Sequence, residues 1–268
     1  MLALDRKNAG FYKKLEDVSI PEKYQIIAAE AFKGNPKMKS LEIRPGMKKI
    51  GKNAFQGCIK LTKVRMAHSV NHLSEGCFAL CPHLSEMQIS SAVSEIPQSA
   101  FKEDRKLRQV YFSENSLLLK IREDAFNECV SLASIQLPEG VLDIGDRAFY
   151  RCKSLSQVTF PSTLERIGKD AFYFCGIEEL ILPDSLEVLE ESAFFKCTKL
   201  ETVCLPESVR YIGKWVFHGC NRLRVLEIRH DPEFIGPWII NKAARIRCYQ
   251  GSKVDAYCQE SGFEVEYL

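Results

Sequence analysis

The chain has 268 residues, of which 46% are hydrophobic and 27% charged, a balance typical of a folded protein and not of a disordered one. Its 37 Lys and Arg residues nearly balance 35 Asp and Glu residues, so the net charge of +2 gives no general attraction to nucleic acid or to anionic membranes. No apolar run approaches the roughly 20 residues that span a bilayer. The N-terminal segment also lacks the apolar core and cleavage site of a secretory signal. We therefore expect no membrane insertion and no nucleic-acid partner.

The first predicted element is a lone strand that includes Leu15, Val18 and Ile20 and ends at Pro21. No Ala-Phe pair accompanies this strand, so the repeat described next starts in the middle of a unit. Residues 1–14 are expected to form an N-terminal tail, either a rudimentary cap or the remnant of a truncation.

A repeat of about 23 residues then runs along the chain, and a fixed period of this order is the signature of a solenoid. Alanine precedes a phenylalanine in seven of nine copies, and an Ile or Leu lies five residues before each phenylalanine. The nine phenylalanines are Phe32, Phe55, Phe78, Phe101, Phe126, Phe149, Phe172, Phe194 and Phe217.

Each repeat carries one predicted strand after its phenylalanine. In the sixth copy Val158 and Phe160 alternate with Gln157 and Thr159, and Pro161 ends the strand. The alternation predicts that one face of each strand is buried and the other is in solvent. Because the strand recurs at a constant offset, the strands are expected to stack as a parallel sheet.

Two copies depart from the common length. The interval from Phe101 to Phe126 is the longest between successive phenylalanines and has extra chain at residues 113–120, which predicts a widened bend after the strand. The interval from Phe172 to Phe194 is the shortest and loses one residue at Cys175–Gly176, where glycine permits a tighter turn.

The C-terminal segment, residues 230–268, does not follow the period. Ser252 and Asp255 have the spacing that starts a capped helix, and Gly262 is a suitable stop. A solenoid needs an atypical last unit to cover its open end. We therefore expect a solenoid over residues 15–229 and a C-terminal capping segment over 230–268.

The motif I-x-x-x-A-F-x-x-C-x-x-L-x-x-V-x-L-P, as in residues 144–161, resembles the BspA-like leucine-rich repeat family over residues 15–229, and the tail IRCYQGSKVDAYCQESGFEVEYL is similar to that family's closing segment. The resemblance implies an α/β-type solenoid, a right-handed leucine-rich repeat array with one short parallel strand per repeat of about 23 residues. The best-known members are bacterial adhesion proteins, which implies a cell-surface or secreted location. The chain itself carries no signal peptide, so a cytoplasmic location is the alternative.

Seven of the eleven cysteines lie three residues after a phenylalanine: Cys58, Cys81, Cys129, Cys152, Cys175, Cys197 and Cys220. Neighbouring copies could form disulfides, or the positions could hold a row of buried free thiols. The second interpretation is favoured because Asn35 and Asp104, which cannot form disulfides, occupy the same position. Cys204 lies on the solvent face of its strand and is expected to be the most reactive thiol.

The most metal-like window is residues 68–83, which contains three histidines and two cysteines. Cys77 and Cys81 already fill core positions of the repeat, so a zinc site is disfavoured and no metal or cofactor is predicted. No nucleophile, phosphate-binding or zinc-hydrolase motif occurs in the sequence. We therefore expect a protein that is not an enzyme.

The solvent face of the strands is the remaining candidate surface. It presents tyrosine beside amides, a combination common in protein-binding surfaces. The predicted function is a non-enzymatic protein-interaction module, of adhesion or host-contact type by the resemblance, that binds a protein ligand through this face. The alternative is a merely solvated face on a structural spacer or intracellular scaffold. The candidate binding residues are Arg65, Gln88, Gln109, Tyr111, Gln136, Gln157 and Thr159.

Overall fold

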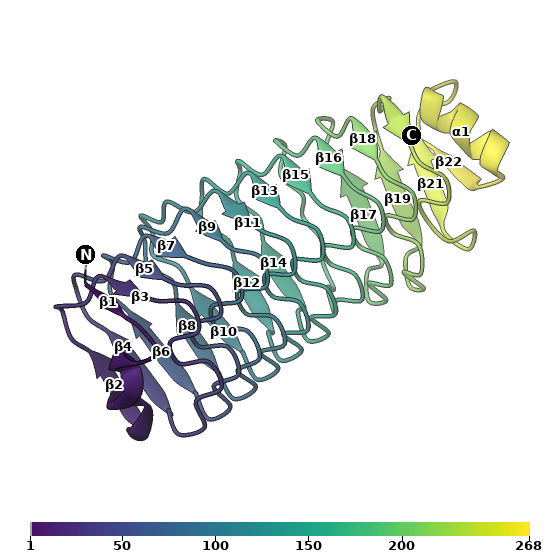
Figure 1. Ribbon diagram of the computed structural model, residues 1–268. Coiled ribbons are helices and arrows are strands. Elements are labelled where there is room, and N and C mark those ends of the chain that lie inside the picture. Colours follow the sequence, from purple (N-terminus) through teal and green to yellow (C-terminus); the bar gives the residue numbers. More distant parts are fainter. Residues whose placement is uncertain (1) are drawn as a thin grey trace.

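The protein is an elongated solenoid whose N- and C-terminal ends lie at opposite ends of the stack (Figure 1). The structure is a computed structural model that describes residues 2–268. One ladder is made of strands of three or four residues, and those from β4 to β19 each follow the phenylalanine of their repeat, as the alternation predicts. These long strands are β2 (Asp17–Ile20), β4 (Ser40–Ile43), β6 (Lys63–Met66), β8 (Glu86–Gln88), β10 (Gln109–Tyr111), β12 (Ser134–Gln136), β14 (Gln157–Thr159), β17 (Thr202–Leu205), β19 (Val225–Ile228), β21 (Arg245–Cys248) and β22 (Glu264–Tyr267).

A second ladder of two-residue strands runs beside the first, so the expectation of one strand per repeat was incomplete. Each short strand from β3 to β18 ends on the Ile or Leu that lies five residues before a phenylalanine, and β1 and β20 end on Leu4 and Ile235. The strand stops there because the chain turns three residues later, where Arg147, for example, takes a left-handed φ of 54°. The short strands are β1 (Ala3–Leu4), β3 (Ile26–Ile27), β5 (Lys49–Ile50), β7 (His72–Leu73), β9 (Glu95–Ile96), β11 (Lys120–Ile121), β13 (Asp143–Ile144), β15 (Arg166–Ile167), β16 (Val188–Leu189), β18 (Tyr211–Ile212) and β20 (Phe234–Ile235).

The nine phenylalanines form one continuous buried row. Neighbouring rings are stacked with centroids 5.1 to 5.9 Å apart and planes within 10° of parallel. Backbone hydrogen bonds accompany the row. The Phe149 amide donates to the Ala171 carbonyl at 2.8 Å, and the equivalent hydrogen bond is present at the other phenylalanines. The row therefore couples every repeat to its neighbours through both packing and hydrogen bonding.

The cysteines that follow the phenylalanines are buried free thiols, which confirms the favoured interpretation. Each donates its S–H to the phenylalanine carbonyl of the preceding repeat, as Cys152 Sγ does to Phe126 O at 3.1 Å. A small thiol thus fills the position and satisfies a buried carbonyl.

The helix predicted near the C-terminus is present as α1 (Lys253–Ser261). The Ser252 side chain accepts a hydrogen bond from the Asp255 amide at 3.1 Å, and Gly262 ends the helix with φ 69°. Val254 and Cys258 are buried, and α1 lies at the end of the stack beside β21 and β22 (Figure 1). Among residues 2–268 this is the one α-helix, two 3-10 turns at Asn8–Gly10 and Tyr12–Lys14 aside, so helix makes a small part of the solenoid. No helix in residues 2–268 is long and apolar enough to cross a bilayer.

The ladders of strands extend beyond the predicted limits of the repeats at both ends. β1 pairs with β3, so residues assigned to a tail take part in the short-strand ladder. At the other end β20 pairs with β18, and β21 and β22 continue the long-strand ladder from β19. Ile240 follows Phe217 by one repeat length and takes the buried ring position of a further repeat.

Both ladders are interrupted, and the sequence explains each break. The short ladder divides between β7 and β9. In other repeats the residue after the short strand donates its amide to the preceding repeat, as Arg122 N does to Ile96 O. Pro97 occupies this position after β9 and has no amide hydrogen to donate. The long ladder divides between β10 and β12 and again between β14 and β17. These two breaks coincide with the longest and the shortest interval between phenylalanines.

One buried carboxyl group interrupts the row of thiols. Asp104 is fully buried, its Oδ1 accepts from the Cys81 amide at 2.7 Å, and its Oδ2 has no hydrogen-bond partner. Burial raises the pKa of Asp104 well above its ordinary value of 3.8. Asp124 shows the opposite balance: burial opposes its ionisation, but hydrogen bonds from Asn127, Arg147 and Lys102 outweigh that effect and lower its pKa.

We predict that Phe149→Ala lowers the free energy of unfolding by about 3–5 kcal/mol, because the substitution removes a buried ring. Phe149 stacks on rings on both sides, whereas Phe217 has a ring, Phe194, on one side only. Phe217→Ala should therefore cost less in the same denaturant titration. Equal costs at the two positions would contradict a stack stabilised mainly by nearest neighbours.

We also predict that Asp104→Asn stabilises the protein increasingly as the pH rises above about 4. The folded state holds the Asp104 proton more tightly than the unfolded chain does, so the wild type loses stability with rising pH. Asparagine keeps the acceptor for the Cys81 amide and never ionises. Asp124→Asn is the matched control with the opposite sign, since its lowered pKa means that the ionised form stabilises the fold at neutral pH. Thermal melts from pH 3 to pH 8 measure both: the cost of Asp124→Asn should be nearly constant above about pH 4 and shrink below it. An Asp104→Asn advantage that did not grow with pH would contradict the assignment.

Candidate functional site

The candidate binding residues all lie on the solvent face of the long strands and all are exposed. Arg65 belongs to β6, Gln88 to β8, Gln109 and Tyr111 to β10, Gln136 to β12, and Gln157 and Thr159 to β14. The register aligns them in two columns, because Gln109 and Tyr111 lie opposite Glu86 and Gln88, and Ser134 and Gln136 lie opposite Gln157 and Thr159. The columns follow the expectation, but the face is not one continuous sheet.

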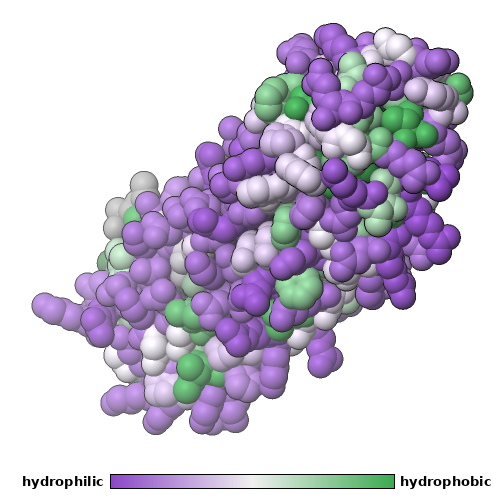
Figure 2. All heavy atoms as spheres, turned by 90° about the vertical axis from the view of Figure 1, so that its right-hand side faces the viewer, coloured by the Kyte–Doolittle hydropathy of each residue, from purple (hydrophilic) through white to green (hydrophobic). Residues whose placement is uncertain are grey.

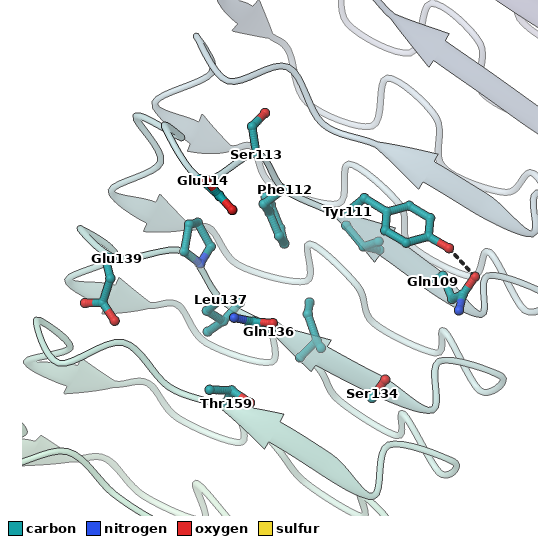
Figure 3. A pocket seen from close by; sticks show the side chains of 13 residues that line it. Gln109, Tyr111, Phe112, Ser113, Glu114, Ser134, Gln136, Leu137, Glu139 and Thr159 are labelled. Carbon is teal, nitrogen blue, oxygen red and sulfur yellow. Dashed lines mark hydrogen bonds between the residues drawn. The ribbon is translucent and has the colours of Figure 1, made fainter.

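A first groove lies where the long ladder divides between β10 and β12 (Figure 3). Its volume is about 550 Å³, and it brings together four of the candidate residues, Gln109, Tyr111, Gln136 and Thr159. Ser134 adds a hydroxyl to the same groove, and Glu114 and Glu139 lie toward the other end of it (Figure 3). The Tyr111 hydroxyl donates to the Gln109 side-chain oxygen, which fixes the ring over its own strand (Figure 3).

The main chains on the two sides of this groove direct polar groups into it. Alternate residues of a parallel strand bond to opposite neighbours. Because Tyr111 O accepts from Ile89 N on the β8 side, Val110 directs its own N–H and C=O toward β12. Because Leu137 N donates to Thr159 O on the β14 side, Gln136 directs its own main-chain groups toward β10. The two strands belong to separate sheets, so these groups face each other across a solvent-open gap without forming a ladder.

A second groove of about 390 Å³ lies on the other side of β14. Its far wall is formed by residues 178–181, which the structure describes outside any strand. Gln157 and Thr159 line it, and Ile181 stands on the far wall with 72% of its surface exposed. The strands β12 and β14 therefore form a separate two-stranded sheet with a groove on each side.

The centre of this face is uncharged, whereas its flanks are charged. From β10 to β14 the exposed residues of the two columns are amides, hydroxyls and one tyrosine. On the N-terminal flank Lys63 Nζ and Glu86 Oε2 lie 4.0 Å apart. On the C-terminal flank Glu178 accepts from Lys199 at 2.6 Å, and that hydrogen bond lowers the pKa of Glu178. Charged partners are thus favoured beside the centre of the face and not over it.

Sequence reasoning found part of this site and missed part. Arg65 and Gln88 are exposed but line neither groove. Ser134, Glu114, Glu139 and Ile181 were not predicted as site residues. The signal that could have found them is the change in repeat length, because both grooves open at a repeat of irregular length.

The other chemical candidates are dispersed in space. Cys77 and Cys81 are fully buried and His72 is exposed on β7. Within residues 2–268 no group of three or more His, Cys, Asp or Glu side chains could hold a metal ion. Cys204 is exposed as expected, but partial burial and then the nearby Glu227 carboxylate raise the pKa of its thiol, which lowers its reactivity.

Hydrophobic side chains on the outside of the molecule are scattered. On the side shown in Figure 2 they form small separate groups within a mostly hydrophilic surface. Tyr111, 48% exposed, and Ile181 are the large apolar residues exposed on the central part of the long-strand face. Recognition at this face would therefore combine isolated apolar contacts with hydrogen bonds.

The sequence matches the family model described as BspA type Leucine rich repeat region (6 copies) over residues 6–118 and 119–246. No curated protein sequence matches the chain. Among solved structures it is similar to a leucine-rich repeat protein from Bacteroides ovatus ATCC 8483, with 22% identity and a TM-score of 0.71 over 91% of this chain and 65% of that one. It is also similar to a leucine rich cell surface protein from Faecalibacterium prausnitzii A2-165, with 23% identity and a TM-score of 0.54 over 99% of this chain and 82% of that one.

The chain thus spans just under two thirds of the Bacteroides ovatus protein, and at these identities the likeness shows the fold alone. The family model covers most of the chain, and its repeat is the unit seen in the phenylalanine row and the paired ladders. The protein belongs to the BspA-type leucine-rich repeat family.

Proposed function

We propose that this protein is a non-enzymatic interaction module that binds a protein partner through the long-strand face, with β10, β12 and β14 at the centre of the contact. The observation that carries the proposal is a section with two grooves, in which the exposed strand columns are uncharged and the carboxylates lie at the edges of the grooves. Interface centres are depleted of charge and enriched in tyrosine, and charges gather at their rims. The candidate residues Gln109, Tyr111, Gln136, Gln157 and Thr159 lie at this centre, with Arg65 and Gln88 toward its edge.

The proposed setting is the bacterial cell surface or the secreted space, with adhesion or host contact as the role. The support is family membership together with a structural relative whose name describes a cell surface protein. A second candidate, an intracellular scaffold without its own ligand, is favoured by one observation: all eleven cysteines are free thiols.

We further propose that residues 230–268 act as a C-terminal cap on a right-handed array over residues 15–229. The support is the placement of α1 across the last strands, with Val254 and Cys258 buried and the Tyr257 hydroxyl donating to Gly236 O at 3.0 Å. A stacked array needs such a unit because its last repeat would otherwise expose a core edge.

For the binding face, we predict that Tyr111→Ala combined with Gln136→Ala reduces capture of a specific partner about tenfold or more, as expected for residues at an interface centre. The measurement is capture by the immobilised protein from purified extracellular-matrix proteins and from cell extract, quantified by mass spectrometry. The matched control is Tyr249→Ala combined with Gln250→Ala, which removes an equally exposed tyrosine and an amide from the turn after β21.

If the wild type and the Tyr111/Gln136 variant retain every captured protein equally while the control also behaves as wild type, the long-strand face is not the site. If the wild type captures no protein above background in either preparation, the scaffold candidate is favoured instead.

For the cap, we predict that Val254→Asp costs about 3 kcal/mol or more of local stability, because it places an unpaired charge in a buried position. Amide hydrogen exchange should accelerate first in β19, β21 and β22 and only later in the central repeats. Ala256→Asp adds the same charge on the exposed side of α1 and should leave exchange in those strands nearly unchanged. Uniform acceleration along the whole solenoid would contradict a capping role.

A further inference from the structure

We propose that the two grooves beside β12–β14 together bind one extended, uncharged peptide segment of the partner, with two apolar side chains four residues apart. This inference rests on the proposed function and adds the chemistry and spacing of what is recognised. One apolar side chain packs against Tyr111 in the first groove, and the other packs against Ile181 in the second.

The spacing follows from the strand register. Tyr111, Gln136, Thr159 and Ile181 occupy the same position in four successive repeats. Three repeat steps separate the first from the last, and the phenylalanine rings of these four repeats lie 5.1 to 5.2 Å apart, which gives about 15 Å in all along the ring row. An extended peptide rises about 3.4 Å per residue, and its side chains on one face recur every second residue. Residues i and i+4 of such a peptide are therefore about 14 Å apart on the same face and match the two exposed apolar residues.

The floor between these anchors suits a peptide backbone. Gln136 and Thr159 present an amide and a hydroxyl, which can both donate and accept hydrogen bonds. The main-chain groups of Val110 and Gln136 that face the first groove add donors and acceptors that the sheet leaves unused. An extended peptide crossing the strands exposes N–H and C=O groups at regular intervals, and the Gln136 and Thr159 side chains can pair with them.

The electrostatics select against a charged segment. The section from β10 to β14 carries no charged residue in its two exposed columns, so a charge on the peptide there would lose hydration without gaining a partner. The far wall of the second groove carries two carboxylates, Glu178 and Glu179, beside Ile181. A basic residue is therefore accommodated only beside the carboxylates at the edges of the grooves, Glu114 and Glu139 in the first and Glu178 and Glu179 in the second.

The apolar anchors favour a peptide over a carbohydrate. Sugar-binding surfaces use flat aromatic rings against the faces of pyranose units, and Tyr111 could serve in that way. Ile181 could not, because its branched aliphatic side chain, 72% exposed, offers contact area and no ring face. A site that needs both residues is suited to apolar peptide side chains.

The experiment selects linear peptides from a random library displayed on phage against the full chain. The expected consensus has two apolar residues separated by three uncharged residues. A synthetic peptide of that consensus is then measured by fluorescence polarisation against the wild type, Tyr111→Ala, Ile181→Ala and the control Tyr249→Ala. We expect each groove variant to weaken binding about tenfold and the control to leave it unchanged. Moving the second apolar residue to i+3 should weaken binding to a similar extent, because it then points to the other face of the peptide.

Three outcomes would overturn the inference: equal binding of the selected peptide to Tyr111→Ala and Ile181→Ala as to the wild type, equal binding of the i+3 peptide, or neutral oligosaccharides that bind the wild type and displace the peptide from it. A failure of the inference remains distinguishable from a failure of the proposed function. If the Tyr111/Gln136 double variant loses a captured protein but no peptide is selected, the long-strand face binds a folded surface, and only the extended segment is refuted.

Discussion

The stacked row of buried phenylalanine rings is the constraint on which the rest of the structure depends. Each ring requires its neighbour about one strand spacing away and nearly parallel, and the adjoining backbone bonds repeat at the same interval. A repeat can therefore change in length only if the change is absorbed elsewhere in its turn. The row stays continuous through the longest interval, where the Phe101 and Phe126 centroids are 5.2 Å apart, and through the shortest, where those of Phe172 and Phe194 are also 5.2 Å apart.

The long-strand face absorbs both changes in length, and this is why the grooves lie there. The short-strand ladder runs unbroken from β9 to β20 across both irregular repeats, whereas the long ladder divides at each of them. Within each repeat, the residues that form the core and the residues that form the candidate site thus lie on different sides of the turn. Rings and thiols hold the stack together on one side of the turn, and irregular spacing of the long strands opens the surface on the other.

Much of this architecture could be predicted from the sequence because it depends on residues that recur. The phenylalanine row, the buried thiol at Cys152 and its equivalents, the long strands and the capped helix after Ser252 all have local signatures. The short strands were missed because each contributes at most one buried residue, such as Ile144, which is too little for a periodic signal. The grooves were missed for another reason. A change in repeat length shows that one of the two ladders must be disturbed, but packing decides which ladder that is. Ile181 has an alternating position like its neighbours, and its exposure on a groove wall follows from the divided ladder.

The separation of the ring stack from the long-strand face affects how the binding surfaces of such proteins can diversify. In most domains a gain or loss of one residue inside a strand connection shifts the register and disturbs the core. Here the extra chain at residues 113–120 and the shortened turn at Cys175–Gly176 leave the ring stack intact and alter only the outer sheet. Small insertions and deletions placed in other repeats would open grooves elsewhere along the solenoid, or close these two, without compromising folding. Related proteins could therefore change the partner that they recognise through insertions and deletions that alter the length of a repeat. This route would be as accessible as substitution of the exposed residues.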